Sequence, residues 1–158
     1  MINENLHKKA VALDRAKHRD LKLENFLFDR SGGHVVKLID FGFSQRYRIG
    51  DTESPGDGSE VELRRMHSVV GTPYFMSPEV CQSKPYNSSS DVWALGCVLY
   101  ELCTLTHPFE AANIAGLGQK VQRGAFAPVH HSYSSSLRSL IASLLSVNPS
   151  SRPSLADI

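Results

Sequence analysis

The chain has 158 residues, of which 41% are hydrophobic and 21% are charged, and its formal net charge is +1 at pH 7. This length supports one domain with a real core, and the near-neutral charge provides no global field that would favour nucleic acid or an anionic membrane as a partner. No apolar run approaches the roughly 20 residues of a membrane span, and the polar start of the chain has no signal-peptide hydrophobic region.

A short helix and a charged loop are predicted first. Leu6, Ala10 and Leu13 recur at helical spacing, which predicts an amphipathic helix over residues 5–16. This helix is short and highly charged. Residues 18–25, with the sequence HRDLKLEN, are then expected to form a loop.

A β-hairpin is predicted after this loop. Residues 26–28 are a short apolar strand, residues 29–33 have the glycine-containing composition of a turn, and residues 35–39 are rich in β-branched side chains. Asp40 follows the second strand. The hairpin should therefore bring the loop and Asp40 to the same end in space.

The next part of the chain has little periodicity. Residues 43–66 match neither a helix nor a strand, and residues 49–58 have loop composition. A loop this long in a compact domain is usually functional or disordered. Residues 71–79, GTPYFMSPE, form a rigid, proline-containing segment that ends in Glu79, a carboxylate expected to be buried.

The central helix is the best candidate for the core. Residues 88–91 offer N-caps, and the apolar side chains of residues 92–103 cover nearly all sides of the helix. His107 and Pro108 end this region. A helix with these properties should be buried on most sides.

The rest of the chain is also predicted to be mostly helical. A weaker helix is expected over residues 112–122, and a loop over residues 128–134. Strong helical periodicity predicts a helix over residues 137–145. Residues 148–149 stop that helix, and residues 152–153 open a last one.

The three cysteines, Cys81, Cys97 and Cys103, are an odd number without metal-site spacing. Cys97 and Cys103 lie in an apolar run, which favours buried thiols in a reducing compartment. We therefore expect the protein in the cytoplasm or the nucleus.

Several polar residues are candidates for a catalytic or binding role, although each can be explained by a structural role when taken alone. His18 can be a packed loop histidine, Asp20 a capping carboxylate, Lys22 a solvated charge and Asp91 the N-cap of the central helix. Taken together, these residues favour a functional site, because they belong to motifs that occur in a defined order along the chain. In chain order these are HRDLKxxN (18–25), DFG (40–42), GT (71–72), SPE (77–79), DxWxxG (91–96) and Arg152.

This ordered set resembles the C-terminal lobe of a eukaryotic protein kinase. The implied fold is mainly α with a small β-hairpin, a kinase-like C-lobe whose N-terminal lobe is absent. The chain would then be a partial kinase domain over residues 1–158, with residues 40–79 as the activation segment.

Two parts of the chain resemble different kinase groups. Residues 71–79 and 91–105 look most like the NIMA-related (NEK) serine/threonine kinases. Residues 21–28 look more like calcium- or calmodulin-dependent kinases. No EF-hand pattern occurs in the sequence to support calcium sensing.

The resemblance implies a serine/threonine kinase that transfers the γ-phosphate of ATP to protein hydroxyl groups, with Mg²⁺ as cofactor. Asp20 would be the catalytic base for the substrate hydroxyl, and Lys22 a cation beside the γ-phosphate. Asn25 and Asp40 offer the hard oxygen ligands that suit Mg²⁺, so Lys22, Asn25 and Asp40 are the candidate nucleotide-binding residues. The alternative is a truncated, inactive kinase-like module that binds or scaffolds partners.

The resemblance also implies regulation and partners. Arg19 suggests control by a phosphate on the loop, where Ser68 is the favoured site and Thr52 another candidate. Thr72 resembles the family's threonine that touches the catalytic residues. The expected partners are a protein substrate and an upstream kinase, or autophosphorylation, but no nucleic acid or membrane.

Structural roles are implied near both ends of the hairpin and around the central helix. His18 would pack against Phe41, and Gly42 would permit the turn that frees the following loop. Glu79 and Arg152 resemble the family's buried ion pair. The remaining structural residues are Asp91, the anchor of the catalytic loop, and Trp93.

The chain departs from the family pattern before His18. No Gly-x-Gly-x-x-Gly motif or strand lysine precedes it, and Ala16-Lys17 replaces the expected apolar pair. The segment 40–79 is long, with an acidic, glycine-containing insert. We therefore expect a fragment that binds ATP poorly by itself and exposes apolar surface where a second lobe would pack.

Overall fold

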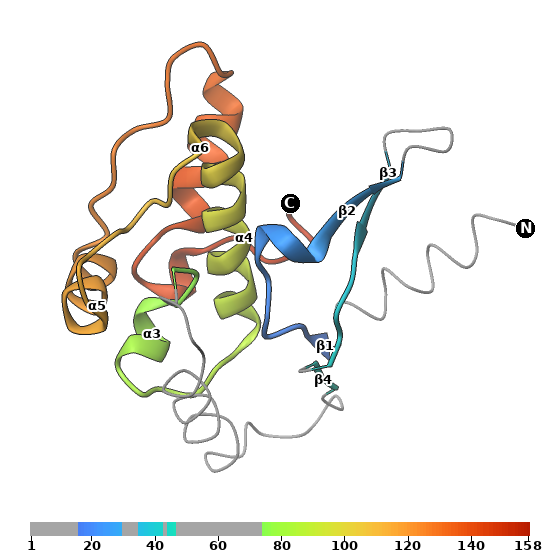
Figure 1. Cartoon of the computed structure of the whole chain (residues 1–158), viewed down its shortest axis with the longest axis horizontal. Coiled ribbons are helices and arrows are strands. Elements are labelled where there is room, and N and C mark those ends of the chain that lie inside the picture. The colour runs from blue at the N-terminus through green and yellow to red at the C-terminus, as the bar shows by residue number, and fades with distance from the viewer. Residues whose placement is uncertain (1–15, 30–34, 43, 47–73) are drawn as a thin grey trace, which may run out of the picture.

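The computed structural model describes residues 16–29, 35–42, 44–46 and 74–158 (Figure 1). The described part is mainly helical, with short strands at its start, as expected. Its elements are β1 (Ala16–Lys17), the 3₁₀ turn η1 (Leu23–Asn25), β2 (Phe26–Asp29), β3 (Val35–Leu38), β4 (Gln45–Arg46), α3 (Pro78–Cys81), α4 (Ser88–Thr104), α5 (Ile114–Arg123), α6 (Ser135–Leu144) and the 3₁₀ turn η2 (Pro149–Ser151).

Strands β2 and β3 form the predicted hairpin. They pair in antiparallel fashion, with Phe26 opposite Leu38. The next backbone hydrogen bond runs from Ile39 N to Asn25 O at 2.9 Å. The hairpin therefore places the end of the loop and the residue before Asp40 side by side, as predicted. In Figure 1 it extends to the right of α4, on the side away from α5.

A second antiparallel pair, β1 with β4, was not predicted from the sequence. Lys17 lies opposite Gln45, so the residues just before the loop pair with residues shortly after Asp40. Strands of two residues are too short to show periodicity in a sequence. Residues 1–15, where most of the first predicted helix falls, lie outside the described residues; Ala16, the last residue of that prediction, belongs to β1.

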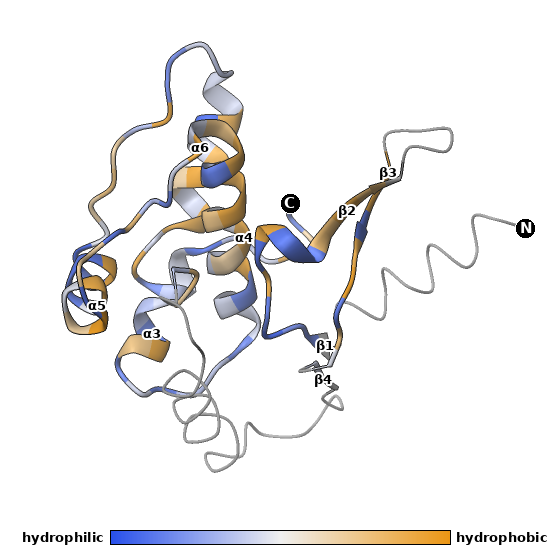
Figure 2. Ribbon diagram, viewed as in Figure 1, coloured by the Kyte–Doolittle hydropathy of each residue, from blue (hydrophilic) through white to orange (hydrophobic). Residues whose placement is uncertain are grey.

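Helix α4 forms the centre of the helical part, as predicted. Trp93, Cys97 and Tyr100 are buried on it, and Phe109 and Ile141 pack into the same cluster. Figure 2 shows hydrophobic residues along much of α4, in agreement with burial on most sides. None of the helices in the described ranges is long and apolar enough to cross a membrane.

The N-cap of α4 is Asn87, so the prediction of caps at residues 88–91 is wrong by one residue. Asn87 has extended backbone angles and forms a capping box with Ser90. Such a box satisfies backbone donors at the helix start reciprocally. Thr104 is the last residue of the helix, and Leu105 caps it in the left-handed conformation (φ 58°).

The last predicted helix, opening at residues 152–153, is wrong. No helix follows η2 in the described residues. Instead, the backbone N–H and the hydroxyl of Ser154 both donate to Asp157 Oδ2, at 3.1 and 2.5 Å. These bonds give the backbone a turn in place of a helix.

The thiols are less uniformly buried than predicted. All three are free, Cys97 is fully buried, and Cys81 and Cys103 are only partly buried. Burial raises the pKa of the Cys81 thiol to about 11 and also raises the pKa of Cys97.

Close packing of α4 against α6 leaves no room for a side chain at Gly96. A Cβ atom at Gly96 would lie 2.8 Å from the Leu144 Cβ. Because the interior is close-packed, Gly96→Ala should lower the free energy of unfolding by about 1–3 kcal/mol. Urea denaturation measures this change.

Gly118→Ala is the matched control for that substitution. Gly118 also lies in a helix, but a Cβ atom there would meet its nearest neighbour, Cys81 Cβ, at an ordinary 3.9 Å. Alanine is favoured over glycine inside helices, so Gly118→Ala should leave stability unchanged or raise it. Equal losses at both glycines would contradict the packing argument.

Candidate functional site

The loop over residues 18–25 gathers Asp20, Lys22 and Asn25. Lys22 Nζ lies 3.0 Å from Asp20 Oδ2, and Asn25 Nδ2 donates to Asp20 O at 2.7 Å and to Oδ2 at 3.1 Å. The turn η1 makes this possible, because Asn25 N bonds back to Lys22 O at 3.0 Å. The Asp20 carboxylate is thus partly exposed and lies between the Lys22 ammonium and the side-chain nitrogen of Asn25. The side-chain oxygen of Asn25 does not face Asp20.

Asp91, in the first turn of α4, holds the backbone of this loop. Its Oδ2 accepts the N–H of His18 at 2.8 Å, and its Oδ1 accepts the N–H of Arg19 at 3.0 Å. Arg19 has φ 69°, in the left-handed region that non-glycine residues rarely adopt. Asp91 does not cap α4, so its carboxylate serves the loop.

His18 is buried and bonded to the backbone through both ring nitrogens. Nε2 lies 3.1 Å from Ile39 O, and Nδ1 accepts the N–H of Asp20 at 3.4 Å. With Nδ1 as an acceptor, Nε2 is the ring nitrogen that can donate to Ile39 O. The predicted packing contact with Phe41 is present, with ring centroids 4.8 Å apart in an edge-to-face arrangement.

Asp40 is exposed at the end of the hairpin. It has φ 60°, and its Oδ1 accepts the N–H of Gly42 at 3.2 Å. Gly42 itself does not have a positive φ. The left-handed position of this turn is therefore Asp40 rather than Gly42.

The donor set at this end of the hairpin fits Mg²⁺. Asn25 turns its nitrogen toward Asp20, which leaves the carboxamide oxygen, and Asp40 offers carboxylate oxygens. In the described ranges no three His, Cys, Asp or Glu side chains cluster in a way that could hold a metal. Mg²⁺ here would depend on Asn25 and Asp40 together with water and phosphate oxygens, which is how Mg²⁺ is commonly bound.

The candidate phosphorylation sites Ser68 and Thr52 lie outside the described residues, as does Thr72, the threonine expected to touch the catalytic residues. Their assignment stays a prediction. Arg19 is described, and its guanidinium carbon lies 5.7 Å from the centroid of the Tyr86 ring.

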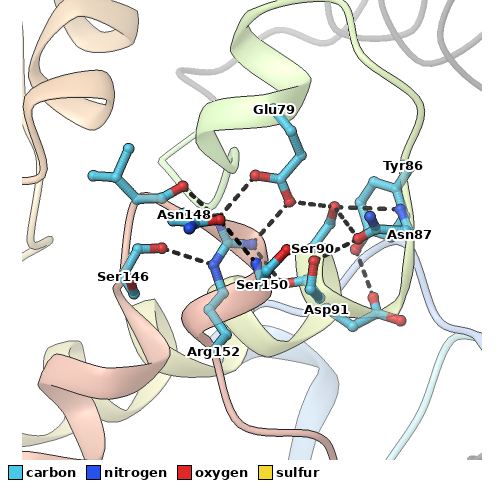
Figure 3. Close-up of polar contacts among 11 residues, drawn as sticks. Glu79, Tyr86, Asn87, Ser90, Asp91, Ser146, Asn148, Ser150 and Arg152 are labelled. Atoms are coloured by element: carbon cyan, nitrogen blue, oxygen red, sulfur yellow. Dashed lines mark hydrogen bonds and ion pairs between the residues drawn. The ribbon is translucent and has the colours of Figure 1, made fainter.

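Glu79 and Arg152 form a buried, bidentate ion pair (Figure 3). Arg152 Nη1 donates to Glu79 Oε1 at 2.8 Å, and Nη2 donates to Oε2 at 2.9 Å. The other N–H groups bond to carbonyl oxygens: those of Ser89, Ser146 and Val147. Every guanidinium N–H group thus has an acceptor, which joins α3, α4 and the segment after α6.

Neighbouring groups complete the surroundings of this pair. Ser90 donates its hydroxyl to Glu79 Oε1 at 2.7 Å. Trp93 is fully buried, with the Arg152 guanidinium carbon 5.0 Å from its ring centroid. Burial by itself raises the pKa of Glu79, but the hydrogen bonds from Arg152 and Ser90 outweigh it and hold the pKa below its usual value.

A family model for the protein kinase domain matches residues 4–158 of the chain. This chain belongs to the protein kinase family. The match covers the loop, the hairpin, the Glu79–Arg152 pair and α4, so the resemblance drawn from the ordered motifs is confirmed.

Curated relatives with similar sequences are NEK serine/threonine kinases. The chain is 48% identical over 141 residues to "Serine/threonine-protein kinase Nek1" of Mus musculus, 46% identical to "Serine/threonine-protein kinase Nek8" of Danio rerio, and 43% identical to "G2-specific protein kinase nimA" of Emericella nidulans. Each alignment covers 89% of this chain but only 11%, 18% and 18% of the respective relative. The kinase domain of this chain therefore corresponds to a small part of these proteins.

Two aromatic contacts of the kinase domain were missed from the sequence. Tyr86 donates its hydroxyl to Asp91 Oδ1 at 2.5 Å. Tyr74 stacks on His107 with ring centroids 3.9 Å apart, which joins the residues before α3 to the residues after α4. Isolated aromatic residues outside periodic segments carry no sequence signal of such partners.

Proposed function

We propose that this chain is the catalytic-loop part of a serine/threonine protein kinase, which transfers the γ-phosphate of ATP to protein hydroxyl groups. The observation that carries the proposal is the arrangement around Asp20. One loop holds this carboxylate beside Lys22 and Asn25, and Asp91 fixes the loop backbone from α4.

Each side chain has a distinct task in this proposal. Asp20 accepts or orients the proton of the substrate hydroxyl, because its carboxylate is partly exposed and lies in the loop's polar cluster. Lys22 adds a positive charge beside it. Asn25 and Asp40 would hold Mg²⁺, which neutralises phosphate charge when bound with ATP.

The exposed face of the hairpin supports a further expectation about the full-length protein. Phe28 and Val36 lie opposite each other in the pairing of β2 with β3 and so share one face, where they are 68% and 50% exposed; Figure 2 shows the hydrophobic character of this hairpin. Apolar patches of this kind generally mark contact surfaces. We propose that the part of the kinase that covers the nucleotide packs here and lies outside the described residues.

Regulation by phosphorylation is a second expectation of the same proposal. A phosphate on Ser68 would supply charge that Arg19 can bind through paired hydrogen bonds. Mass spectrometry of the active protein would locate such a phosphate.

The test of the function uses the full-length protein with ATP, Mg²⁺ and a generic protein acceptor. We expect phosphate on serine or threonine of the acceptor, and none when Mg²⁺ is removed with a chelator. Asp40→Asn should raise the Mg²⁺ concentration needed for half-maximal activity, because a neutral carboxamide replaces a charged ligand.

Tyr133→Phe serves as the control variant, since this exposed tyrosine lies in the loop before α6. A folded wild-type protein that transfers no phosphate would contradict the proposal and favour the alternative of a non-catalytic binding module. Phosphate on tyrosine alone would contradict the serine/threonine class.

A further inference from the structure

Tyr86 lies between α3 and α4 and contacts the residues that lead into the candidate catalytic loop. Its hydroxyl donates to Asp91 Oδ1 at 2.5 Å, and its backbone oxygen accepts a hydrogen bond from Lys17 Nζ at 3.1 Å. Its ring centroid lies 5.7 Å from the guanidinium carbon of Arg19. Figure 3 shows Tyr86 beside Asp91, at the side of the Glu79–Arg152 network.

The oxygen that Tyr86 contacts is the one that holds Arg19. Asp91 Oδ1 accepts both the Tyr86 hydroxyl and the backbone N–H of Arg19. Arg19 has φ 69°, a conformation that non-glycine residues keep only when their surroundings hold them in it. The bond from Tyr86 restricts the position of the carboxylate that maintains this backbone angle.

The direction of Asp20 depends on the same turn. Asp20 directly follows Arg19, and its own N–H lies 3.4 Å from His18 Nδ1. His18 in turn has its backbone N–H bonded to Asp91 Oδ2 at 2.8 Å. A shift of Asp91 would therefore reach the backbone of both residues that precede Asp20.

We propose that Tyr86 is a positioning residue for phosphoryl transfer. Its hydroxyl fixes the Asp91 carboxylate, which keeps Arg19 in the left-handed turn that presents Asp20. This inference rests on the proposed function. It separates Tyr86 from a merely structural residue, because loss of a structural contact alone would lower stability and leave kcat of the folded protein unchanged.

The first test is Tyr86→Phe in the full-length protein, which removes the hydroxyl and keeps the ring over Arg19. We expect kcat to fall about tenfold, since the hydroxyl no longer restrains the Asp91 carboxylate, with KM for ATP nearly unchanged. Tyr133→Phe removes an exposed hydroxyl elsewhere and should leave kcat unchanged. A kcat for Tyr86→Phe within twofold of wild type would overturn the inference.

The second test asks whether Tyr86 acts through Asp91. In an Asp91→Asn background, adding Tyr86→Phe should lower the residual kcat little further, because interacting residues are not additive. A full tenfold loss in that background would refute the route through Asp91.

Amide hydrogen exchange tests the contact without reference to activity. We expect faster exchange of the Arg19 N–H in Tyr86→Phe than in wild type, and unchanged exchange would overturn the positioning role. A wild-type protein without kinase activity would refute the proposed function, whereas an active wild type with an unaffected Tyr86→Phe variant would refute this inference alone.

Discussion

Asp20→Asn in the full-length protein is expected to lower kcat for phosphoryl transfer by about 10²–10⁴-fold. General-base contributions are usually of this size, and asparagine keeps the shape of the side chain but cannot accept a proton. The lost group is the carboxylate that lies 3.0 Å from Lys22 Nζ. Steady-state kinetics with saturating ATP and Mg²⁺ measure the change.

This prediction is specific because kcat should fall while KM for ATP should not. Asp20 is not among the residues proposed to hold nucleotide, so KM for ATP should change little. Asp157→Asn is the matched control, because that carboxylate is exposed and bonded to Ser154 near the end of the described chain. An Asp20→Asn variant that keeps more than about a tenth of wild-type kcat would remove Asp20 from the role of base.

Arg152→Met should lower the free energy of unfolding by about 3–5 kcal/mol. The substitution leaves Glu79 buried without the guanidinium that pairs both of its oxygens, and an unpaired buried charge is costly. The carbonyl oxygens of Ser89, Ser146 and Val147 would also lose a donor. Urea denaturation at neutral pH measures the loss.

Two further variants test whether the loss of stability comes from the ion pair or from the loss of any arginine. Arg123→Met, at the exposed last turn of α5, should cost less than about 1 kcal/mol. The double variant Glu79→Leu/Arg152→Met should lose less than the sum of its single variants, since no charge is left unpaired. Strict additivity would show that the two side chains are not coupled.

The ion pair also predicts the pH dependence of stability. Because the pKa of Glu79 is lowered in the folded state, its contribution is complete above the unfolded pKa and is lost as pH falls through the folded pKa. In Arg152→Met, Glu79 keeps the hydrogen bond from Ser90 but loses the guanidinium, so burial raises the pKa of Glu79 relative to wild type and protonation relieves the unpaired charge. The stability gap between wild type and variant should therefore narrow as pH falls below neutral.

The sequence predicted those parts of the site that depend on short-range pairing. Asn25 and Asp40 were expected at one end of a hairpin, and the register of β2 and β3 places them there. The apolar pattern of α4 likewise predicted its burial. Hairpin register and helix periodicity are set by residues near one another in the chain, so they can be read from local composition.

Details of backbone conformation were less predictable. Asp40 and Arg19 have positive φ, whereas the neighbouring Gly42 does not. Glycine is the usual residue for this conformation, so composition alone favours it. The actual positions depend on the hydrogen bonds that hold each turn.

By itself, the amino-acid sequence determined the order of the kinase motifs, the hairpin and the central buried helix. Only the tertiary structure decided which backbone N–H groups of the loop Asp91 accepts, that Tyr86 shares an oxygen with Arg19, and which carbonyl groups satisfy Arg152. Asp91 and Arg152 meet partners that lie up to 73 residues away in the chain. Such contacts arise when α4 packs against the loop and the C-terminal segment, and no local pattern of side chains specifies them.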